Sequence, residues 1–182
     1  MKFIKTDLKD AYIIELEKKE DNRGFFARAW CTKEFKQNRL QSNIVQCNIS
    51  YTNTKGSIRG MHFQLRPYQE VKLIRCISGE VYDVIIDLRK ESPTYKKWQG
   101  VKLSDHNYKM LYVPKGFAHG FQTLKSNSVV FYAVSEFYHP EAEKGIRWND
   151  PAFNIAWPLE ATEISERDES HPDFEENHLI TK

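Results

Sequence analysis

Short strand-like segments separated by turn residues run along most of this chain, and no long amphipathic helical pattern interrupts them. A series of about nine such segments is typical of an all-β sandwich or barrel. Ser78-Gly79 predicts a hairpin between two of them, and residues 32–36 predict one or two helical turns with Thr32 as N-cap. The expected strands are 12–16, 44–51, 58–64, 71–77, 80–88, 98–103, 109–113, 118–124 and 128–137. Residues 18–23 are expected to form a loop, and residues 163–182 a charged tail on the surface or against the barrel.

The size and charge of the chain limit its partners. We expect 182 residues to form one domain, residues 1–182, with a sizeable core. Twenty-seven Lys and Arg against 25 Asp and Glu give a net charge of +2, which predicts binding neither to nucleic acid nor to an anionic membrane. No run approaches the roughly 18 apolar residues of a membrane span. Basic residues are therefore expected to act locally.

The cysteines and the N-terminal residues indicate the cellular compartment in which we expect the protein. Cys31, Cys47 and Cys76 are odd in number and contain no C-x-x-C pair, which argues against a zinc knuckle or a redox pair. The first residues lack the apolar core of a signal peptide. Reduced, partly buried thiols in a cytoplasmic protein are the expectation.

The window from Gly56 to Gln64 has the spacing of a metal-binding strand in a small β-barrel, but its residue types do not suit a metal. Cupin-type barrels supply two His and a Glu here and a third His from a later strand, where this chain has His62, Gln64, Lys72 and His119. An ammonium group repels a cation and attracts an oxyanion. The sequence therefore predicts no metal at this site, and proton transfer beside a developing negative charge.

Strand alternation predicts which side chains share a face. His62 should point the same way as Gly60 and Gln64, whereas Arg59, Met61 and Phe63 should point the other way. Lys72 lies in an apolar run, so it either faces a buried anion or reaches solvent from an edge strand.

Two further polar side chains stand in apolar strands. Asp83 shares a face with Val81 and should be buried beside a partner, for which His119 is a candidate. That pair could equally be a structural ion pair. Tyr132 could be a core residue or a general acid.

Several segments taken together resemble a known family. They are residues 21–26, 58–64, 72–75, 83–89 with 92–94, 114–121, 148–151 with 157–158, and 165–168. In this order, over about residues 10–172, they resemble the dTDP-4-dehydrorhamnose 3,5-epimerase family, nucleotide-sugar epimerases on a cupin-like jelly roll. The resemblance implies an all-β double-stranded β-helix with short peripheral helices and a cytoplasmic isomerase. It also implies a nucleotide-sugar substrate on a route to rhamnose or a related surface sugar.

The resemblance also implies roles for particular residues. His62 would be the general base, oriented by Asp168; Lys72 would hold the sugar's O4; and Tyr132 would be the general acid on the opposite face. His119 would line the pocket with Asp83 as its support, and the residues that contact the substrate would include Arg23, Gln46, Asn48 and Arg59. The family needs no metal or organic cofactor, and it forms homodimers that exchange an N-terminal strand.

Three positions depart from the family pattern. Arg28 stands where a glutamate is usual, Glu70 where a glutamine is usual, and Arg167 where a lysine is common. None removes a catalytic group, but they leave the nucleotide (dTDP, GDP or CDP), the sugar and C3-only epimerisation open. Three further functions are compatible with such a barrel: a 3,4-ketoisomerase, a sugar-binding protein without activity and a metal-dependent dioxygenase.

Overall fold

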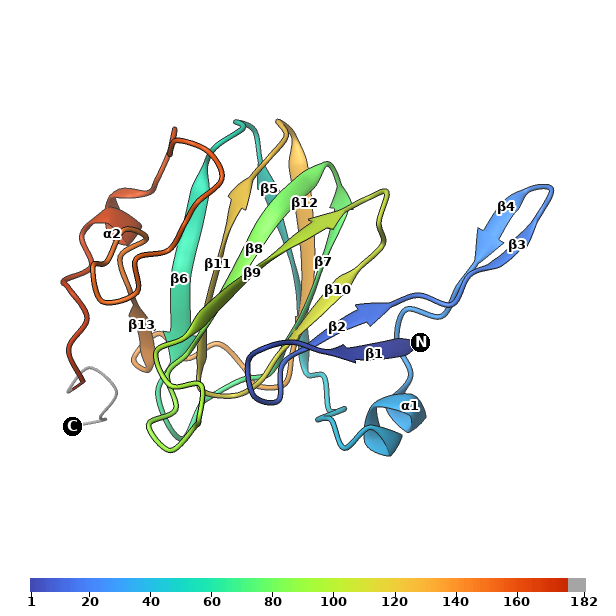
Figure 1. The fold of residues 1–182 in the computed structure, drawn as a ribbon, viewed down its shortest axis with the longest axis horizontal. Coiled ribbons are helices and arrows are strands. Elements are labelled where there is room, and N and C mark those ends of the chain that lie inside the picture. Colours follow the sequence, from blue (N-terminus) through green and yellow to red (C-terminus); the bar gives the residue numbers. More distant parts are fainter. Residues whose placement is uncertain (177–182) are drawn as a thin grey trace.

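The computed structural model describes residues 1–176 as two antiparallel sheets packed face to face. The six-stranded sheet has the order β1-β2-β10-β7-β12-β5, and the five-stranded sheet has the order β13-β6-β11-β8-β9 (Figure 1). The hairpin β3-β4 projects away from the sandwich at the N-terminal side (Figure 1). The predicted all-β, cupin-like jelly roll with short peripheral helices is confirmed.

The elements have the following bounds. The N-terminal part contains β1 (Lys2–Lys5), β2 (Tyr12–Glu15), β3 (Lys19–Asp21), β4 (Gly24–Phe26) and α1 (Thr32–Gln37). The sandwich continues with β5 (Gln46–Thr52), β6 (Ile58–Gln64), β7 (Lys72–Ser78), β8 (Glu80–Asp87), β9 (Trp98–Ser104), β10 (Met110–Val113), β11 (Phe117–Thr123) and β12 (Ser128–Val134). The C-terminal part contains β13 (Glu143–Gly145) and α2 (Glu166–Glu169).

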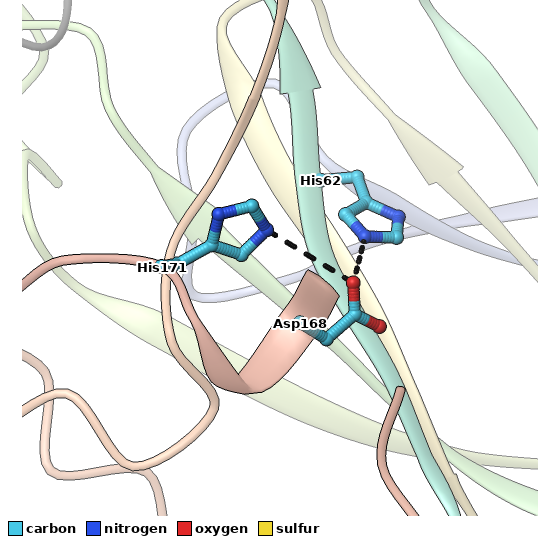
Figure 2. A group of neighbouring side chains, drawn as sticks. All are labelled: His62, Asp168 and His171. Atoms are coloured by element: carbon cyan, nitrogen blue, oxygen red, sulfur yellow. Dashed lines mark hydrogen bonds and ion pairs between the residues drawn. The ribbon is translucent and has the colours of Figure 1, made fainter. Parts of the chain in front are cut away.

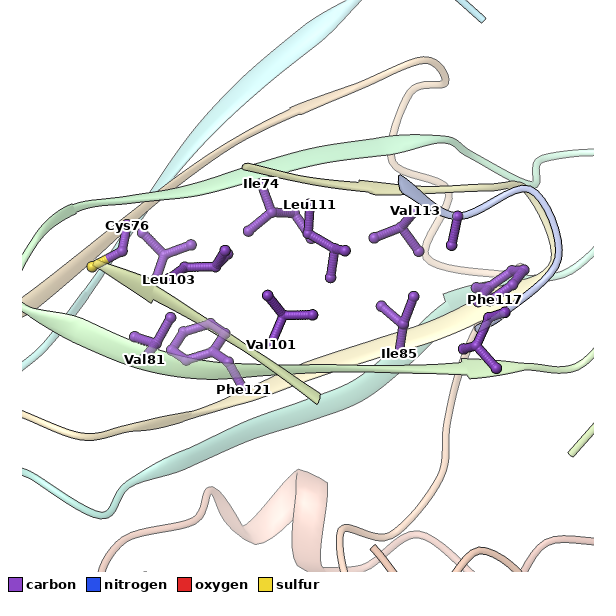
Figure 3. Close-up of a cluster of buried hydrophobic side chains, with 13 residues drawn as sticks. Ile74, Cys76, Val81, Ile85, Val101, Leu103, Leu111, Val113, Phe117 and Phe121 are labelled. Atoms are coloured by element: carbon purple, nitrogen blue, oxygen red, sulfur yellow. The ribbon is translucent and has the colours of Figure 1, made fainter. Parts of the chain in front are cut away.

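Alternating apolar residues place the core in three layers. The layer between the sheets includes Ile74, Ile85, Leu111 and Phe121 (Figure 3). A second cluster under the C-terminal segment covers the outer face of the five-stranded sheet, and a third, around Phe35 of α1, covers the outer face of the six-stranded sheet. The core between the sheets lies away from β5 and β6, so that end is left for a cavity.

Most predicted strands are confirmed, and β6 has the predicted bounds. Three local predictions are wrong. Residues 18–23 are not a loop but contribute to the β3-β4 hairpin. Cys31, not Thr32, is the N-cap of α1, without a side-chain cap. The strands β1 and β13 were not expected. Of the predicted tail, residues 163–176 pack on the barrel and residues 177–182 lie outside the described part.

No helix among residues 1–176 is long and apolar enough to cross a membrane. The three cysteines are free, but the expectation that they are partly buried is wrong for Cys47, which is exposed. Burial raises the pKa of the Cys76 thiol to about 11.

Asp87 is the last residue of β8 in the five-stranded sheet, and its hydrogen bonds are expected to stabilise the fold. It is fully buried and accepts hydrogen bonds from Arg89, Ser92 and Thr94. Burial alone would raise its pKa, but these bonds prevail and lower it below 3.8. Because its pKa is depressed in the folded state, the Asp87 carboxylate contributes to the free energy of unfolding. This contribution is complete above about pH 4 and is lost as the pH falls through the folded-state pKa.

We expect Asp87→Asn to lower the free energy of unfolding by about 3 kcal/mol at pH 7, because the amide turns a donor toward groups that all donate. Urea unfolding measures this change. The exposed Asp7→Asn variant is the control and should stay within about 0.5 kcal/mol. Equal effects of the two substitutions would show that the Asp87 network contributes no stability.

Candidate active site

A cavity with two lobes lies between the sheets near β5 and β6. The larger lobe has a volume of about 420 Å³ and the smaller about 300 Å³. His62 from the five-stranded sheet, and Lys72 and Tyr132 from the six-stranded sheet, line both lobes. The structure thus brings together three of the four predicted catalytic side chains at the junction of the lobes.

Asp168, the fourth predicted catalytic residue, lies directly against His62. His62 Nε2 and Asp168 Oδ1 are 2.7 Å apart, and Asp168 Oδ2 accepts a hydrogen bond of 3.0 Å from the Gly60 backbone N–H (Figure 2). Ser165 caps α2 by accepting from the Asp168 N–H, which fixes the carboxylate in the first turn. Burial would raise the pKa of Asp168, but the contact with His62, the Gly60 N–H and the nearby His171 together outweigh it, and the pKa is lowered. The carboxylate therefore stays charged and orients the imidazole.

The predicted alternation along β6 fails at Gly60, with consequences for Arg59. Register with β11 shifts there: His119 pairs with His62, but Phe121 pairs with Arg59, which leaves one extra residue in β6. Gly60 has φ +103, and a Cβ there would lie 2.7 Å from the His119 carbonyl oxygen. The bulge brings Arg59 into the lining of the same lobe as His62, so the prediction that it points away from His62 is wrong.

Lys72 faces a half-buried carboxylate, which corresponds to one of the two environments predicted for it. Its Nζ lies 3.0 Å from Glu70 Oε1, and both side chains are only 12% exposed. Gln64 donates to the other Glu70 oxygen at 3.1 Å and is held in turn by the backbone of the 137–139 segment. Gln64 and Glu70 therefore place the ammonium group at the cavity.

The pair of Asp83 and His119 is confirmed. Both Asp83 oxygens lie 3.0 Å from His119 Nε2, and Asp83 is fully buried. His119 lines the larger lobe. Gln46 and Asn48 on β5 are joined by a hydrogen bond of 3.0 Å and line the smaller lobe.

Arg23 and Arg28 do not line the cavity of their own chain. Arg23 stands at the turn of the projecting β3-β4 hairpin, with its side chain 84% exposed and paired with Asp21. Arg28 pairs with Glu34 of α1 and lines neither lobe. The structure does not bring the predicted substrate-binding residue Arg23 to the site formed by its own chain.

The sequence reasoning missed four site residues. Tyr138 and Arg167 both donate to Glu143, and this trio borders the cavity. Tyr138 lies in a loop, Glu143 in the three-residue strand β13 and Arg167 in the four-residue helix α2, and none of these segments is long enough to give a periodic signal. His171, close to Asp168, was also missed, although its spacing of three from Asp168 placed it beside that residue.

His62, Asp168 and His171 are also the donor types of a zinc site. Metal bonds of about 2 Å to two tetrahedral ligands would hold these ligands more than about 3 Å apart. The 2.7 Å between His62 and Asp168 instead fits a shared proton.

A cupin-like sandwich with a His–Asp pair, a lysine and a tyrosine at one cavity has the groups of an acid–base enzyme. The family model for dTDP-4-dehydrorhamnose 3,5-epimerase matches residues 5–176. The chain belongs to this family.

Similar proteins agree over nearly the whole length. A dTDP-4-dehydrorhamnose 3,5-epimerase of Methanothermobacter thermautotrophicus is 45% identical, over 97% of this chain and 96% of that protein. The crystal structure of the Elizabethkingia anophelis enzyme has a TM-score of 0.93 at 40% identity and covers 96% of each chain. That of the Bacillus anthracis enzyme, solved with TDP and pyrophosphate bound, has a TM-score of 0.92 at 42% identity, covering 95% of this chain and 99% of that one.

Proposed function

We propose that this protein epimerises C3 and C5 of dTDP-4-dehydro-6-deoxyglucose, giving dTDP-4-dehydrorhamnose. The observation that carries the proposal is the placement of His62 and Tyr132 on opposite sheets across one cavity. Inversion at carbon removes a proton from one face and returns one to the other. A sugar ring lying between the sheets has the base on one side and the phenol on the other.

The chemistry follows from the keto group at C4. C3 and C5 are both adjacent to it, so removing either proton places negative charge on O4. The Lys72 ammonium group beside O4 strengthens its interaction as that charge grows, which lowers the barrier rather than only binding the substrate. Glu70 and Gln64 hold that ammonium group before substrate arrives.

His62 supplies the base, because an imidazole can accept a carbon-bound proton and release it again. Its Nε2 faces Asp168, so Nδ1, which makes no hydrogen bond among residues 1–176, is the atom that takes the carbon-bound proton. Asp168 holds the Nε2–H tautomer and stabilises the imidazolium that forms. Tyr132 then donates to the opposite face. No step requires a metal or an organic cofactor.

Isotope exchange tests this function. The enzyme is incubated with the 4-keto sugar nucleotide in deuterium oxide, and NMR follows C3 and C5. We expect deuterium at both carbons, with the carbonyl remaining at C4. A carbonyl that moves to C3 would indicate a 3,4-ketoisomerase, exchange at C3 alone a C3 epimerase, and no exchange would overturn the proposal.

Tyr132→Phe separates the acid from the base. Without the phenol, His62 can still remove and return a proton on one face, so exchange at C3 should survive better than full inversion. NMR of the product measures both, with the wild-type protein as reference. Equal loss of exchange at the two carbons would contradict this division of roles.

The base of the nucleotide is tested by binding. We propose dTDP, and the TDP-bound Bacillus anthracis structure supports this. A thermal-shift panel of dTDP, UDP, GDP and CDP measures the choice, because a ligand at 100 times its Kd adds about 2.7 kcal/mol of stability. A larger shift with GDP or CDP would redirect the assignment.

We also propose a cytoplasmic homodimer of a single domain, residues 1–182. Phe26 on the projecting hairpin is 72% exposed, and Ile49 on the edge strand β5 is 68% exposed. Exposed apolar side chains on the edge strand β5 and on the projecting hairpin are typical of surfaces that bind another protein, and we propose a second copy of this chain as that partner. In such a dimer the hairpin reaches the partner's β5 and carries Arg23 toward its cavity. Sedimentation should give a dimer for wild type and a monomer for Phe26→Asp; a monomeric wild type would refute the dimer.

A further inference from the structure

His171 shares the carboxylate that orients the catalytic base. Its Nε2 lies 3.9 Å from Asp168 Oδ1, the same oxygen that lies 2.7 Å from His62 Nε2. The two imidazole rings meet edge to face at 82°, with centroids 6.3 Å apart, on either side of Asp168 (Figure 2). His171 Nε2 is buried and has no hydrogen-bond partner among residues 1–176. The proposed chemistry uses His62 and Asp168 but gives His171 no task.

The absence of a side chain at Gly145 makes room for the His171 ring. A Cβ on Gly145 would lie 1.9 Å from His171 Nε2, so the ring occupies the space that any other residue at 145 would fill. Gly145 belongs to β13 and pairs with His62 of β6. His171 is therefore packed against the strand that neighbours the base.

The charges around the ring come from three elements. They are Asp168 and Arg167 of α2, His62 of β6 and Glu143 of β13. Burial first, and then the neighbouring His62, lower the pKa of His171 below its ordinary 6.5. The Asp168 carboxylate thus lies close to both imidazoles, and burial favours the neutral form of His171. If His171 were a cation, it would compete for the charge on Asp168 and disfavour the His62 imidazolium.

We propose that His171 is a positioning residue for the epimerase reaction: a neutral imidazole that packs behind Asp168 and leaves its negative charge available to His62. This inference rests on the proposed function. It assigns no contact between His171 and the sugar.

Three substitutions at residue 171 separate charge from packing. His171→Gln keeps a neutral N–H donor, His171→Leu keeps bulk without a donor, and His171→Lys adds a fixed cation. We expect kcat for deuterium exchange within about threefold of wild type for Gln and about tenfold lower for Lys. For Lys we also expect the acid limb of the pH profile to move about one unit lower, since a like charge weakens the base. Leu, which is neutral and bulky like the buried imidazole, should also keep kcat within about threefold of wild type, with KM unchanged.

Controls make each outcome decisive. The exposed His106→Lys variant should leave rate and pH profile unchanged, and a chelator in every assay removes adventitious metal. Melting temperature and dTDP binding establish that each variant is folded. Identical pH profiles for folded Gln and Lys variants would reduce His171 to packing and overturn the inference. If wild type itself exchanges no deuterium, the proposed function fails instead.

The wild-type protein offers a test that needs no variant. NMR of the histidine ring nitrogens follows His62 and His171 separately through a pH titration. We expect His171 to remain neutral at pH values where free imidazole is half protonated, about 6.5. Titration of His171 at or above that value would overturn the inference.

Discussion

Replacing His62 with alanine is expected to abolish deuterium incorporation at both C3 and C5, with a loss of at least about 10³-fold in rate. His62 is the imidazole that lines both lobes of the cavity with a free Nδ1, and among residues 1–176 His119 is held by both oxygens of Asp83. NMR in deuterium oxide measures both carbons at once. Thermal stabilisation by dTDP should remain, which separates loss of the base from loss of binding.

Asp168→Asn provides a second test, because it changes the tautomer of His62 while the side chain at residue 168 keeps its size. The Gly60 N–H can only donate, so it takes the single amide oxygen. The amide NH2 then faces His62 Nε2, which must accept, and the imidazole proton moves to Nδ1. A protonated Nδ1 cannot take a proton from carbon. We expect a loss approaching that of His62→Ala; exchange within about tenfold of wild type for either variant would place the base elsewhere.

The parts of the fold that follow from local pattern were predictable from sequence. The chain break at Gly56 indicated where β6 begins, and an isolated carboxylate in an apolar strand indicated the pair of Asp83 and His119. Burying a charge without a partner is unfavourable, so a charged residue in such a strand predicts its own partner. The same reasoning gave an anion as one of two alternatives for Lys72, but it did not identify Glu70 as that anion.

The parts that depend on pairing between distant strands were not predictable. The bulge at Gly60 is set by β11, about sixty residues on, and only this pairing brings Arg59 to the cavity. The short strand β13 exists because β6 offers it an edge. His171 gains its position from Gly145, whose missing side chain makes room for the ring. No local period encodes these contacts.

The position of Arg23 shows a further limit. The family resemblance assigns this residue to the substrate, yet it stands at the turn of the hairpin and does not line the cavity of its own chain. In the proposed homodimer, the second copy would bring it to a site. Arg28, the most conspicuous departure from the family pattern, is paired with Glu34 beside α1 and so does not alter the lining of this cavity.

Lys72→Met is expected to lower the rate of exchange by about 10²- to 10³-fold at both carbons, because the charge that grows on O4 loses its ammonium partner. The substitution has a second effect that must be separated from the first. Glu70 would be left as a buried carboxylate with Gln64 as its remaining side-chain partner, which destabilises the fold by about 3 kcal/mol.

The double variant Lys72→Met/Glu70→Gln resolves the two effects, because it removes both members of the pair. We expect urea unfolding to show most of the lost stability restored, while exchange stays as slow as in Lys72→Met. Glu70→Gln alone keeps the ammonium group but loosens its position, so its rate should fall by only about tenfold. Recovery of exchange in the double variant would mean that Lys72 acts through folding and not on O4. A slow but stable double variant places its contribution in the transition state, where the enolate charge is greatest.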